Sequence, residues 1–272
     1  MKKTILLITI SVAAFAVTGF YPAKKRKLIW ADEFNRTGAP DSTRWSYDLG
    51  DGCKAPSGCG WGNNEKEFYT KDPKNVRIEN GHLVIEAHRE QRGESAYTST
   101  RMVSKHKGDW QYGKIEIRAK LPRGRGVWPA IWMLSTDEKH GGWPGNGEID
   151  IMEYVGWKPG VVHGTVHTEA YNGMKGTQKE GKTPLADCSD QFHTYAIDWT
   201  KDKIDFMVDD KVFHGFVRNS ADDYKGWPFD QRFHLIMNIA VGGGWGGAEG
   251  IDESIWPQKM EVDWVRVWSL ER

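Results

Sequence analysis

The chain has 272 residues, and its 37 basic and 37 acidic side chains give a formal charge of zero. A nucleic-acid-binding protein normally carries a basic surplus, so this balance argues against that class. It also argues against a disordered acidic tail. The 31 glycines exceed the usual share of about 7%, and 14 tryptophans accompany them. This composition indicates a turn-rich β protein that displays flat apolar rings.

The N-terminal segment has the pattern of an export signal. Two lysines precede an almost wholly apolar run over 4–20, which is the order of a charged region and an apolar region in a signal peptide. We expect residues 1–23 to be this signal, cleaved within 18–23, and the mature protein to be secreted, periplasmic or at the cell surface. A retained membrane anchor is the alternative, because the apolar run approaches the length of a spanning helix. No other segment is apolar enough to cross a membrane.

Three cysteines follow, two of them close together in a glycine-rich loop. In an exported protein, Cys53 and Cys59 are able to close a small disulfide, and two free thiols are the alternative. Cys188 has no obvious partner in the sequence. No second pair of cysteines or histidines has the spacing of a zinc site.

Alternation of apolar and polar residues is the dominant pattern after residue 27. It is clear over 83–87, 114–121, 203–208 and 233–241, and turn pairs such as Asn80-Gly81 separate these runs. Such alternation places one side of each strand in a core and the other towards water or a cleft. No long stretch keeps a helical period. We therefore predict an all-β fold with two packed sheets, a sandwich of jelly-roll type, over a single domain at 27–270.

A tryptophan-rich strand is expected next, within 124–134. Trp128 and Trp132 share one face of it, while Ile131 and Met133 share the other. The two indoles are able to form a floor for sugar rings, whose C–H faces are apolar. They are equally able to pack against the second sheet, and alternation alone does not separate these readings.

Three acids within six residues form the most informative motif. Glu148 and Asp150 are two residues apart and share a strand face, but regular alternation would turn Glu153 to the opposite, apolar side. A charged glutamate there would be costly unless it were paired. A β-bulge at Ile151-Met152 adds one residue and corrects the phase. The sequence therefore predicts a bulge that brings all three acids to one face.

Aligned acids suit the hydrolysis of glycosidic bonds. Two carboxyl groups about 5–5.5 Å apart are used in retaining hydrolysis, one as nucleophile and one as acid/base. A third acid shifts the proton affinities of its neighbours, which helps an acid/base to stay protonated near neutral pH. A cage for a hard cation is a competing interpretation, and three solvated acids on an exposed strand are the third.

Polar residues on other segments are candidates to support the acids. His163 and His167 lie on one side of the strand expected over 161–168, and a histidine beside acids is able to hydrogen-bond a carboxylate or an intermediate. For His163, a purely structural role as a hydrogen-bonded histidine of the sheet is at least as good an interpretation as a role beside the acids. The loop over 60–65 offers the amide of Asn63, either for sugar hydroxyls or for turns. Arg101 is a weaker candidate on spacing alone.

The acidic motif Glu148-Ile149-Asp150-Ile151-Met152-Glu153 resembles the signature of glycoside hydrolase family 16 in its bulged form. The resemblance extends over 28–268 and includes the segments 30–35, 60–65, 128–133 and 262–267. The segment 164–168 followed by 176–178 is similar to the laminarinase branch, which consists of endo-1,3-β-glucanases. The lichenase and xyloglucan transferase branches lack the extra methionine. The resemblance implies a curved jelly-roll sandwich with its substrate cleft on the concave face.

The resemblance also implies a role for each matching residue. Glu148 would be the nucleophile, Glu153 the acid/base, and Asp150 would hold a proton between them. Five further positions would contact sugar or support the acids, namely Asn63, Arg101, Trp128, Trp132 and His167. No cofactor would be needed for catalysis.

Many family members hold a structural Ca²⁺ away from the cleft, and the matching positions here are Glu33, the Gly81 carbonyl and Asp263. The implied protein is a secreted, monomeric endo-β-1,3-glucanase that retains anomeric configuration and acts on a laminarin-like polysaccharide. Mixed-linkage β-glucan or a galactan as substrate, and a β-glucan-binding protein without turnover, are the alternatives. Transglycosylation and exo action also stay open.

Overall fold

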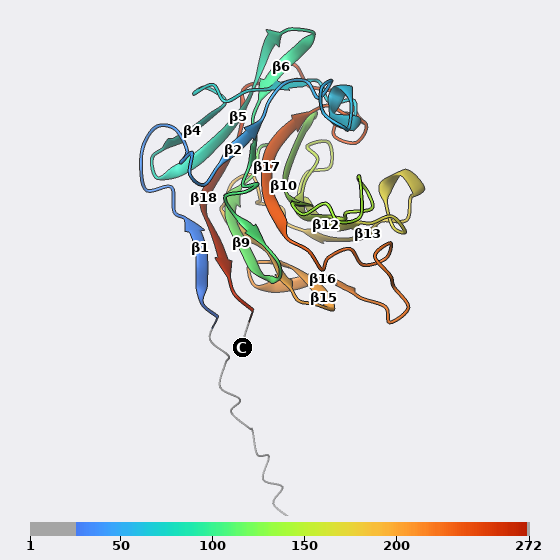
Figure 1. Ribbon diagram of the computed structural model, residues 1–272. Coiled ribbons are helices and arrows are strands. Elements are labelled where there is room, and N and C mark those ends of the chain that lie inside the picture. The colour runs from blue at the N-terminus through green and yellow to red at the C-terminus, as the bar shows by residue number, and fades with distance from the viewer. Residues whose placement is uncertain (1–25, 271–272) are drawn as a thin grey trace, which may run out of the picture.

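The computed structural model describes residues 26–270, so the expected signal peptide over 1–23 lies outside the described part. Figure 1 shows the strands bent into two curved layers, which are a ten-stranded and an eight-stranded sheet. The helical elements among the described residues are two 3-10 turns, η1 (Cys59–Gly62) and η2 (Gly173–Lys175). None of the described helices has the length and apolar character needed to span a bilayer. The predicted all-β sandwich is confirmed.

The ten-stranded sheet runs in the order β16, β15, β14, β9, β18, β5, β6 and β3, with β1 beside β18 and β4 beside β5. All its neighbours pair antiparallel except β3 with β6. Its strands are β1 (Leu28–Asp32), β3 (Glu67–Tyr69), β4 (Val76–Glu79), β5 (His82–Arg92), β6 (Ser95–Ser99), β9 (Gly113–Lys120), β14 (His193–Trp199), β15 (Lys203–Val208), β16 (Lys211–Val217) and β18 (Gln258–Trp268).

The eight-stranded sheet carries the acidic motif. It runs in the order β13, β12, β11, β10, β17, β7 and β2, with β8 beside β17. Its strands are β2 (Ser46–Asp48), β7 (Arg101–Val103), β8 (Asp109–Trp110), β10 (Val127–Ser135), β11 (Glu148–Glu153), β12 (Val161–His167), β13 (Lys179–Pro184) and β17 (Phe233–Val241). The acids thus lie near the middle of this sheet, two strands from its β13 edge.

The core lies between the two sheets and follows the predicted alternation. In β9, Ile115 and Ile117 are fully buried while their neighbours are partly exposed. Ile131 of β10 and Ile149 of β11 are also fully buried and belong to the same apolar cluster. Burial of each such side chain contributes about 1.5–3 kcal/mol. The inward faces therefore fix which residues of β10 and β11 face outward.

Two of the predicted turns are formed by residues in the left-handed region. Asn80 and Gly81 join β4 to β5 with φ of 54° and 77°. Asp209 and Asp210 join β15 to β16 with φ of 48° and 62°. Such angles match the two-residue hairpin turns that favour Asn, Asp and Gly. These short connections keep consecutive strands adjacent in the ten-stranded sheet.

The cysteine-bearing loop is closed covalently. Cys53 and Cys59 form a disulfide, so the first of the two readings of these cysteines is correct. Cys188 is a buried free thiol, and burial raises its pKa. The disulfide ties the segment before η1 to η1 itself, next to the loop that carries Asn63.

Candidate active site

The bulge predicted from the acidic motif is present in β11. Asp150 pairs with Thr165 and Glu153 pairs with His163, so two residues of β11 oppose one residue of β12. The pairing of β11 with β10 shifts at the same place. The extra residue is therefore at Ile151–Met152, as the spacing of the acids predicts.

The bulge separates apolar and acidic side chains onto opposite faces. Ile149, Ile151 and Met152 are all fully buried in the core. Glu148 and Glu153 stay partly exposed on the outer face of the eight-stranded sheet, which we call the acid-bearing face. Because the core accepts the apolar residues on both sides of the bulge, none of the three acids has to enter it.

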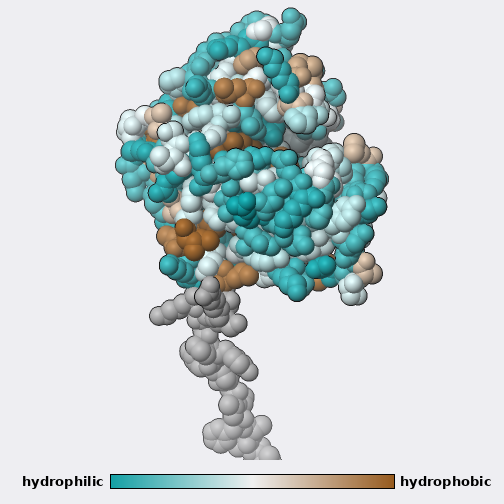
Figure 2. Space-filling view, viewed as in Figure 1, coloured by the Kyte–Doolittle hydropathy of each residue, from teal (hydrophilic) through white to brown (hydrophobic). Residues whose placement is uncertain are grey.

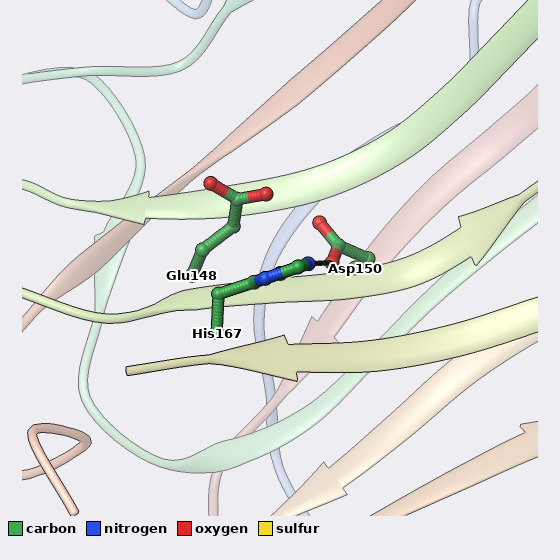
Figure 3. A group of neighbouring side chains, drawn as sticks. All are labelled: Glu148, Asp150 and His167. Carbon is green, nitrogen blue, oxygen red and sulfur yellow. Dashed lines mark ion pairs between the residues drawn. The ribbon is translucent and has the colours of Figure 1, made fainter. Parts of the chain in front are cut away.

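Glu148, Asp150 and His167 converge on this face (Figure 3). Their ligand atoms all lie within 4.8 Å of one another, and His167 Nε2 is 3.3 Å from Asp150 Oδ2. The backbone N–H of Gly173 donates to His167 Nδ1 at 3.2 Å. Because that nitrogen accepts, the ring proton of a neutral His167 is on Nε2, although Asp150 Oδ2 has no hydrogen-bond partner among the described residues. The structure thus places His167 beside the acids.

Two of the acids have strongly raised proton affinities. Burial raises the pKa of Asp150 well above its ordinary value, and the neighbouring Glu148 raises it further. Burial of the carboxyl group likewise raises the pKa of Glu153, with Asp150 and Glu148 adding to the shift. Trp128 partly opposes this shift, because its Nε1–H donates to Glu153 Oε1 at 3.0 Å. A carboxyl group with such surroundings is able to act as a general acid near neutral pH.

Glu148 is held by a residue that the sequence reasoning did not single out. Trp143 Nε1–H donates to Glu148 Oε2 at 2.7 Å. Trp143 comes from the loop before β11 and is 47% exposed, so it has no alternation pattern that would mark it. The glycines on either side of Trp143 indicate a loop before the acidic strand, but they do not show where the indole points.

The two tryptophans of β10 lie on the acid-bearing face and not in the core. Trp128 and Trp132 are both partly exposed, and their N–H groups bond to Glu153 and Asn238. Trp245 packs edge-on against Trp128 with ring centroids 5.5 Å apart. The structure therefore excludes packing of this pair against the second sheet, and the role of the two indoles as a floor for sugar rings stays a prediction.

Arg101 of β7 reaches the same face. Its guanidinium lies over the ring of Trp61 at 4.6 Å and over that of Trp132 at 4.7 Å. Its Nε is also 3.1 Å from Asp48 Oδ2. A cation held between two indoles is attracted by both rings, so Arg101 is fixed beside the sugar-binding surface that Trp132 is expected to form.

Asn63 and the disulfide loop border one end of this face. Asn63 Nδ2 donates to Glu65 Oε1 at 3.0 Å, and Gly244 N–H donates to the Asn63 carbonyl at 2.7 Å. A cavity of about 860 Å³ lies beyond Glu65 and is lined in part by Cys53 and Cys59. The disulfide loop thus forms part of the wall of a hollow that Glu65 also lines.

His163 matches the plainer of its two readings. It is 4% exposed, and its Nδ1 hydrogen-bonds the carboxylate of Glu180 on the neighbouring strand β13. Desolvation by burial lowers the pKa of His163. The ring also packs edge-on against Trp245 at 5.0 Å. Its contacts are those of a structural sheet histidine, although Nε2 has no hydrogen-bond partner among the described residues.

The donor atoms of the acidic cluster are arranged for protons and not for a metal ion. A divalent cation needs free lone pairs on its ligands. A neutral His167 whose Nδ1 accepts from Gly173 carries its proton on Nε2, the nitrogen nearer to the acids. Binding a cation through all three groups would require that proton to leave, whereas Glu148 Oε1 and Asp150 Oδ2 have no such contact to give up. The cation-cage interpretation is therefore the weaker one.

The positions matched to a structural Ca²⁺ have arginine partners. Glu33 receives two hydrogen bonds from Arg266, at 2.9 and 2.8 Å, which lower its pKa. Asp263 forms an ion pair with Arg118. Gly81 lies close by in the turn that leads into β5, which pairs with β18 beside Asp263. In this arrangement the carboxylates of Glu33 and Asp263 bind guanidinium groups. The calcium site stays a prediction, and binding of the ion there would require at least one of these two ion pairs to open.

A β-sandwich that presents a buried acid, two flanking carboxyl groups and a floor of indoles has the equipment of an enzyme that cleaves glycosidic bonds. Comparison with known proteins agrees. Residues 63–266 match the family described as "Glycosyl hydrolases family 16", and the chain belongs to this family. It is thus a glycoside hydrolase.

The similarity covers almost the whole chain. The sequence is 46% identical to a beta-glucanase of Rhodothermus marinus, over 98% of this chain and 94% of that protein. It is 41% identical to a glucan endo-1,3-beta-glucosidase of Cryptopygus antarcticus, over 89% of this chain and 92% of that protein. The solved structure of the laminarinase from Rhodothermus marinus superposes with a TM-score of 0.86 at 48% identity, and the match covers 90% of this chain and 98% of that one.

Proposed function

We propose that the protein is a secreted endo-β-1,3-glucanase that hydrolyses internal β-1,3-glucosidic bonds with retention of configuration. One observation carries the mechanism: the bulge at Ile151–Met152 brings Glu148, Asp150 and Glu153 to one face, where burial and like charge raise the pKa of Glu153. The choice of β-1,3-glucan is supported by the names of the relatives, a beta-glucanase and a glucan endo-1,3-beta-glucosidase.

In the first step, Glu153 gives its proton to the glycosidic oxygen while Glu148 attacks the anomeric carbon. The bond from carbon to the leaving oxygen breaks, and an ester forms between the sugar and Glu148. The Trp143 N–H that donates to Glu148 Oε2 leaves Oε1 as the oxygen without an indole partner. The indole N–H of Trp128 orients Glu153 towards the same region.

In the second step, Glu153 acts as a base. It takes a proton from water, the water oxygen attacks the anomeric carbon, and the ester to Glu148 breaks. Two inversions at the same carbon retain the configuration. Burial raises the pKa of Glu153, which keeps this side chain protonated before the first step and makes its ionised form a stronger base in the second.

Asp150 keeps the two working acids in different protonation states. Its own pKa is raised by burial and by Glu148, so it is protonated when Glu148 is the anion that attacks. A proton on Asp150 next to Glu148 prevents repulsion between two carboxylates in one buried group. His167 Nε2 lies 3.3 Å from Asp150 Oδ2 and limits the positions open to that carboxyl group.

The setting of the enzyme is part of the proposal. The export signal expected over 1–23 supports secretion or a periplasmic or cell-surface location. Figure 2 shows a mainly hydrophilic face on which hydrophobic residues occur in small separate patches, which supports a monomer, since subunit interfaces bring such patches together. A single catalytic domain over 27–270 fits the two sheets that share one core.

The test measures release of reducing sugars from laminarin. Glu148→Ala and Glu153→Ala should each abolish it, while Glu79→Ala, an acid of β4 in the other sheet, should not change it. Retained activity in either of the first two variants would refute the assignment. NMR of the first product should show the β-anomer before mutarotation, and an initial α-anomer would exclude retention.

Two alternatives are distinguished by substrate and by turnover. A panel of laminarin, mixed-linkage glucan, agar and carrageenan, with sizing of the products, identifies the linkage and separates endo from exo action. A β-glucan-binding protein would bind laminarin and release no sugar. Because both carboxyl groups needed for hydrolysis are present and aligned, we expect turnover.

A further inference from the structure

We propose that Tyr69 is a positioning residue that couples two sugar contacts on the acid-bearing face, Trp132 and Asn63. The proposal rests on the proposed function, because these two side chains are sugar contacts only if the face binds a glucan. Tyr69 lies in β3, and it touches neither Glu148 nor Glu153 in the hydrogen bonds of the described residues.

A continuous relay of hydrogen bonds joins the two contacts. Trp132 Nε1–H donates to Asn238 Oδ1 at 2.7 Å, and Asn238 Nδ2 donates to the Tyr69 hydroxyl at 3.0 Å. The Tyr69 hydroxyl donates to Glu65 Oε2 at 3.0 Å, and Asn63 Nδ2 donates to Glu65 Oε1 at 3.0 Å. The relay thus runs from the indole floor in β10 to the loop at the rim.

Each bond of the relay has only one workable direction. The indole N–H can only donate, so Asn238 has to present its carbonyl oxygen to Trp132 and its NH₂ to Tyr69. The hydroxyl of Tyr69 then accepts from Asn238 and donates its single proton to Glu65. The Glu65 carboxylate accepts at both ends. A change at one end therefore alters the partner available at the other.

Burial makes the inner part of the relay rigid, whereas the bond from Asn63 to Glu65 is exposed. Tyr69 is fully buried and Asn238 is 5% exposed, and unpaired polar groups are costly in such surroundings. Beneath it lies Glu67, whose Oε2 accepts the Val241 N–H at 2.6 Å. Burial raises the pKa of Glu67, with Glu65 adding to the shift.

The relay also sets the place of Arg101. Its guanidinium lies over the Trp132 ring at 4.7 Å, so the tilt of this indole contributes to the position of the cation, which Trp61 and Asp48 also hold. Three groups that face the expected sugar, namely Trp132, Arg101 and Asn63, thereby depend on one hydroxyl. We expect Tyr69→Phe to raise KM for laminarin about tenfold, since the loss of one buried hydrogen bond is of this order. Its effect on kcat should be much smaller, because the acids keep their contacts.

The coupling is tested by double-mutant cycles. Asn63→Ala, Trp132→Phe and their combination are made in two backgrounds that both carry Glu148→Gln, so that the sugar is not cleaved. One background keeps Tyr69 and is called the wild type in this test, and the other carries Tyr69→Phe. Binding of laminarihexaose is measured by calorimetry. In the wild type, the losses should be non-additive by a factor of about five or more. In Tyr69→Phe they should multiply independently. Additive losses in the wild type would overturn the proposal.

Tyr195→Phe is the matched control. Tyr195 is also fully buried, but it lies in β14 of the other sheet and its hydroxyl has no hydrogen-bond partner among the described residues. This variant should leave KM and the coupling unchanged. If it changes them as Tyr69→Phe does, the effect is one of general stability and the relay is refuted.

A measurement without sugar separates this proposal from the proposed function. The indole N–H resonance of Trp132 should shift in Asn63→Ala, and this shift should disappear in the Tyr69→Phe background. If the indole N–H resonance of Trp132 does not shift in Asn63→Ala, the relay is refuted, even if laminarin is cleaved. A wild type that cleaves no glucan but shows the coupled shift would refute the proposed function and leave the coupling through Tyr69 established.

Discussion

Replacing Glu153 by glutamine isolates the proton that this side chain supplies. Glutamine has the same shape, and its carbonyl oxygen is able to keep the 3.0 Å hydrogen bond from Trp128 Nε1–H. The bulge and the buried residues of β11 are untouched. The variant therefore differs from the wild type in one respect, which is that the leaving oxygen receives no proton.

The size of the effect follows from the role of a general acid. A positioned acid accelerates a reaction by about 10²–10⁴, which corresponds to about 3–5 kcal/mol of activation free energy. Glu153→Gln should therefore lower kcat for laminarin by this factor. KM should change little, because the hydrogen bond to Trp128 and the indole floor persist.

The assay compares two leaving groups. A laminaribioside of dinitrophenol needs no proton to depart, so Glu153→Gln should form the ester to Glu148 at close to the wild-type rate, as seen in a burst of dinitrophenolate. Added azide, which needs no general base, should restore turnover and give the β-glycosyl azide. Equal losses on laminarin and on the aryl substrate would refute the role of Glu153. Glu148→Gln is the control that should lose both reactions.

Three further predictions concern pH, stability and calcium. Trp128→Phe removes the N–H that lowers the pKa of Glu153, so this pKa should rise and the acid should stay protonated to higher pH. The alkaline limb of kcat/KM against pH should therefore move to higher pH. A move of this limb to lower pH would contradict the reasoning. Ile149→Ala removes a fully buried side chain and should lower the free energy of unfolding by about 2–5 kcal/mol, as measured in urea. Calcium at 100 times its dissociation constant should add about 2.7 kcal/mol of stability to the wild type and nothing to Asp263→Ala, and a melting temperature that responds to neither Ca²⁺ nor chelator would exclude the site.

The faces of the acidic strand could be predicted from the sequence because two physical rules apply to it together. Alternation fixed the faces of Ile149 and Ile151, and the cost of burying a carboxylate excluded the inward orientation of Glu153. Only an extra residue reconciles the two rules, so the bulge could be placed within two residues. His167 followed in the same way, because its strand alternates without interruption.

Residues outside this strand carried weaker signals. Trp143 comes from a glycine-rich loop, and Tyr69 comes from a three-residue strand, so neither has a period that shows which way it points. Asn238 lies in β17, which is buried on both faces, so burial there did not mark one side as functional. Their partners are far away in the chain, and only the packing of the two sheets decides that they meet.

The kink in β11 has a consequence for changes in chain length. Two residues of a strand share a face when an even number of positions separates them. The bulge adds one residue to β11, so Glu148 and Glu153 share a face although five positions separate them. A variant lacking one residue at 151–152 would read Glu-Ile-Asp-Ile-Glu or Glu-Ile-Asp-Met-Glu, in which plain alternation presents all three acids on the same side. Deleting one residue at this point is thus compatible with the catalytic arrangement. A deletion just before Glu148 or just after Glu153 is different, because no bulge lies there to compensate for the change of strand face.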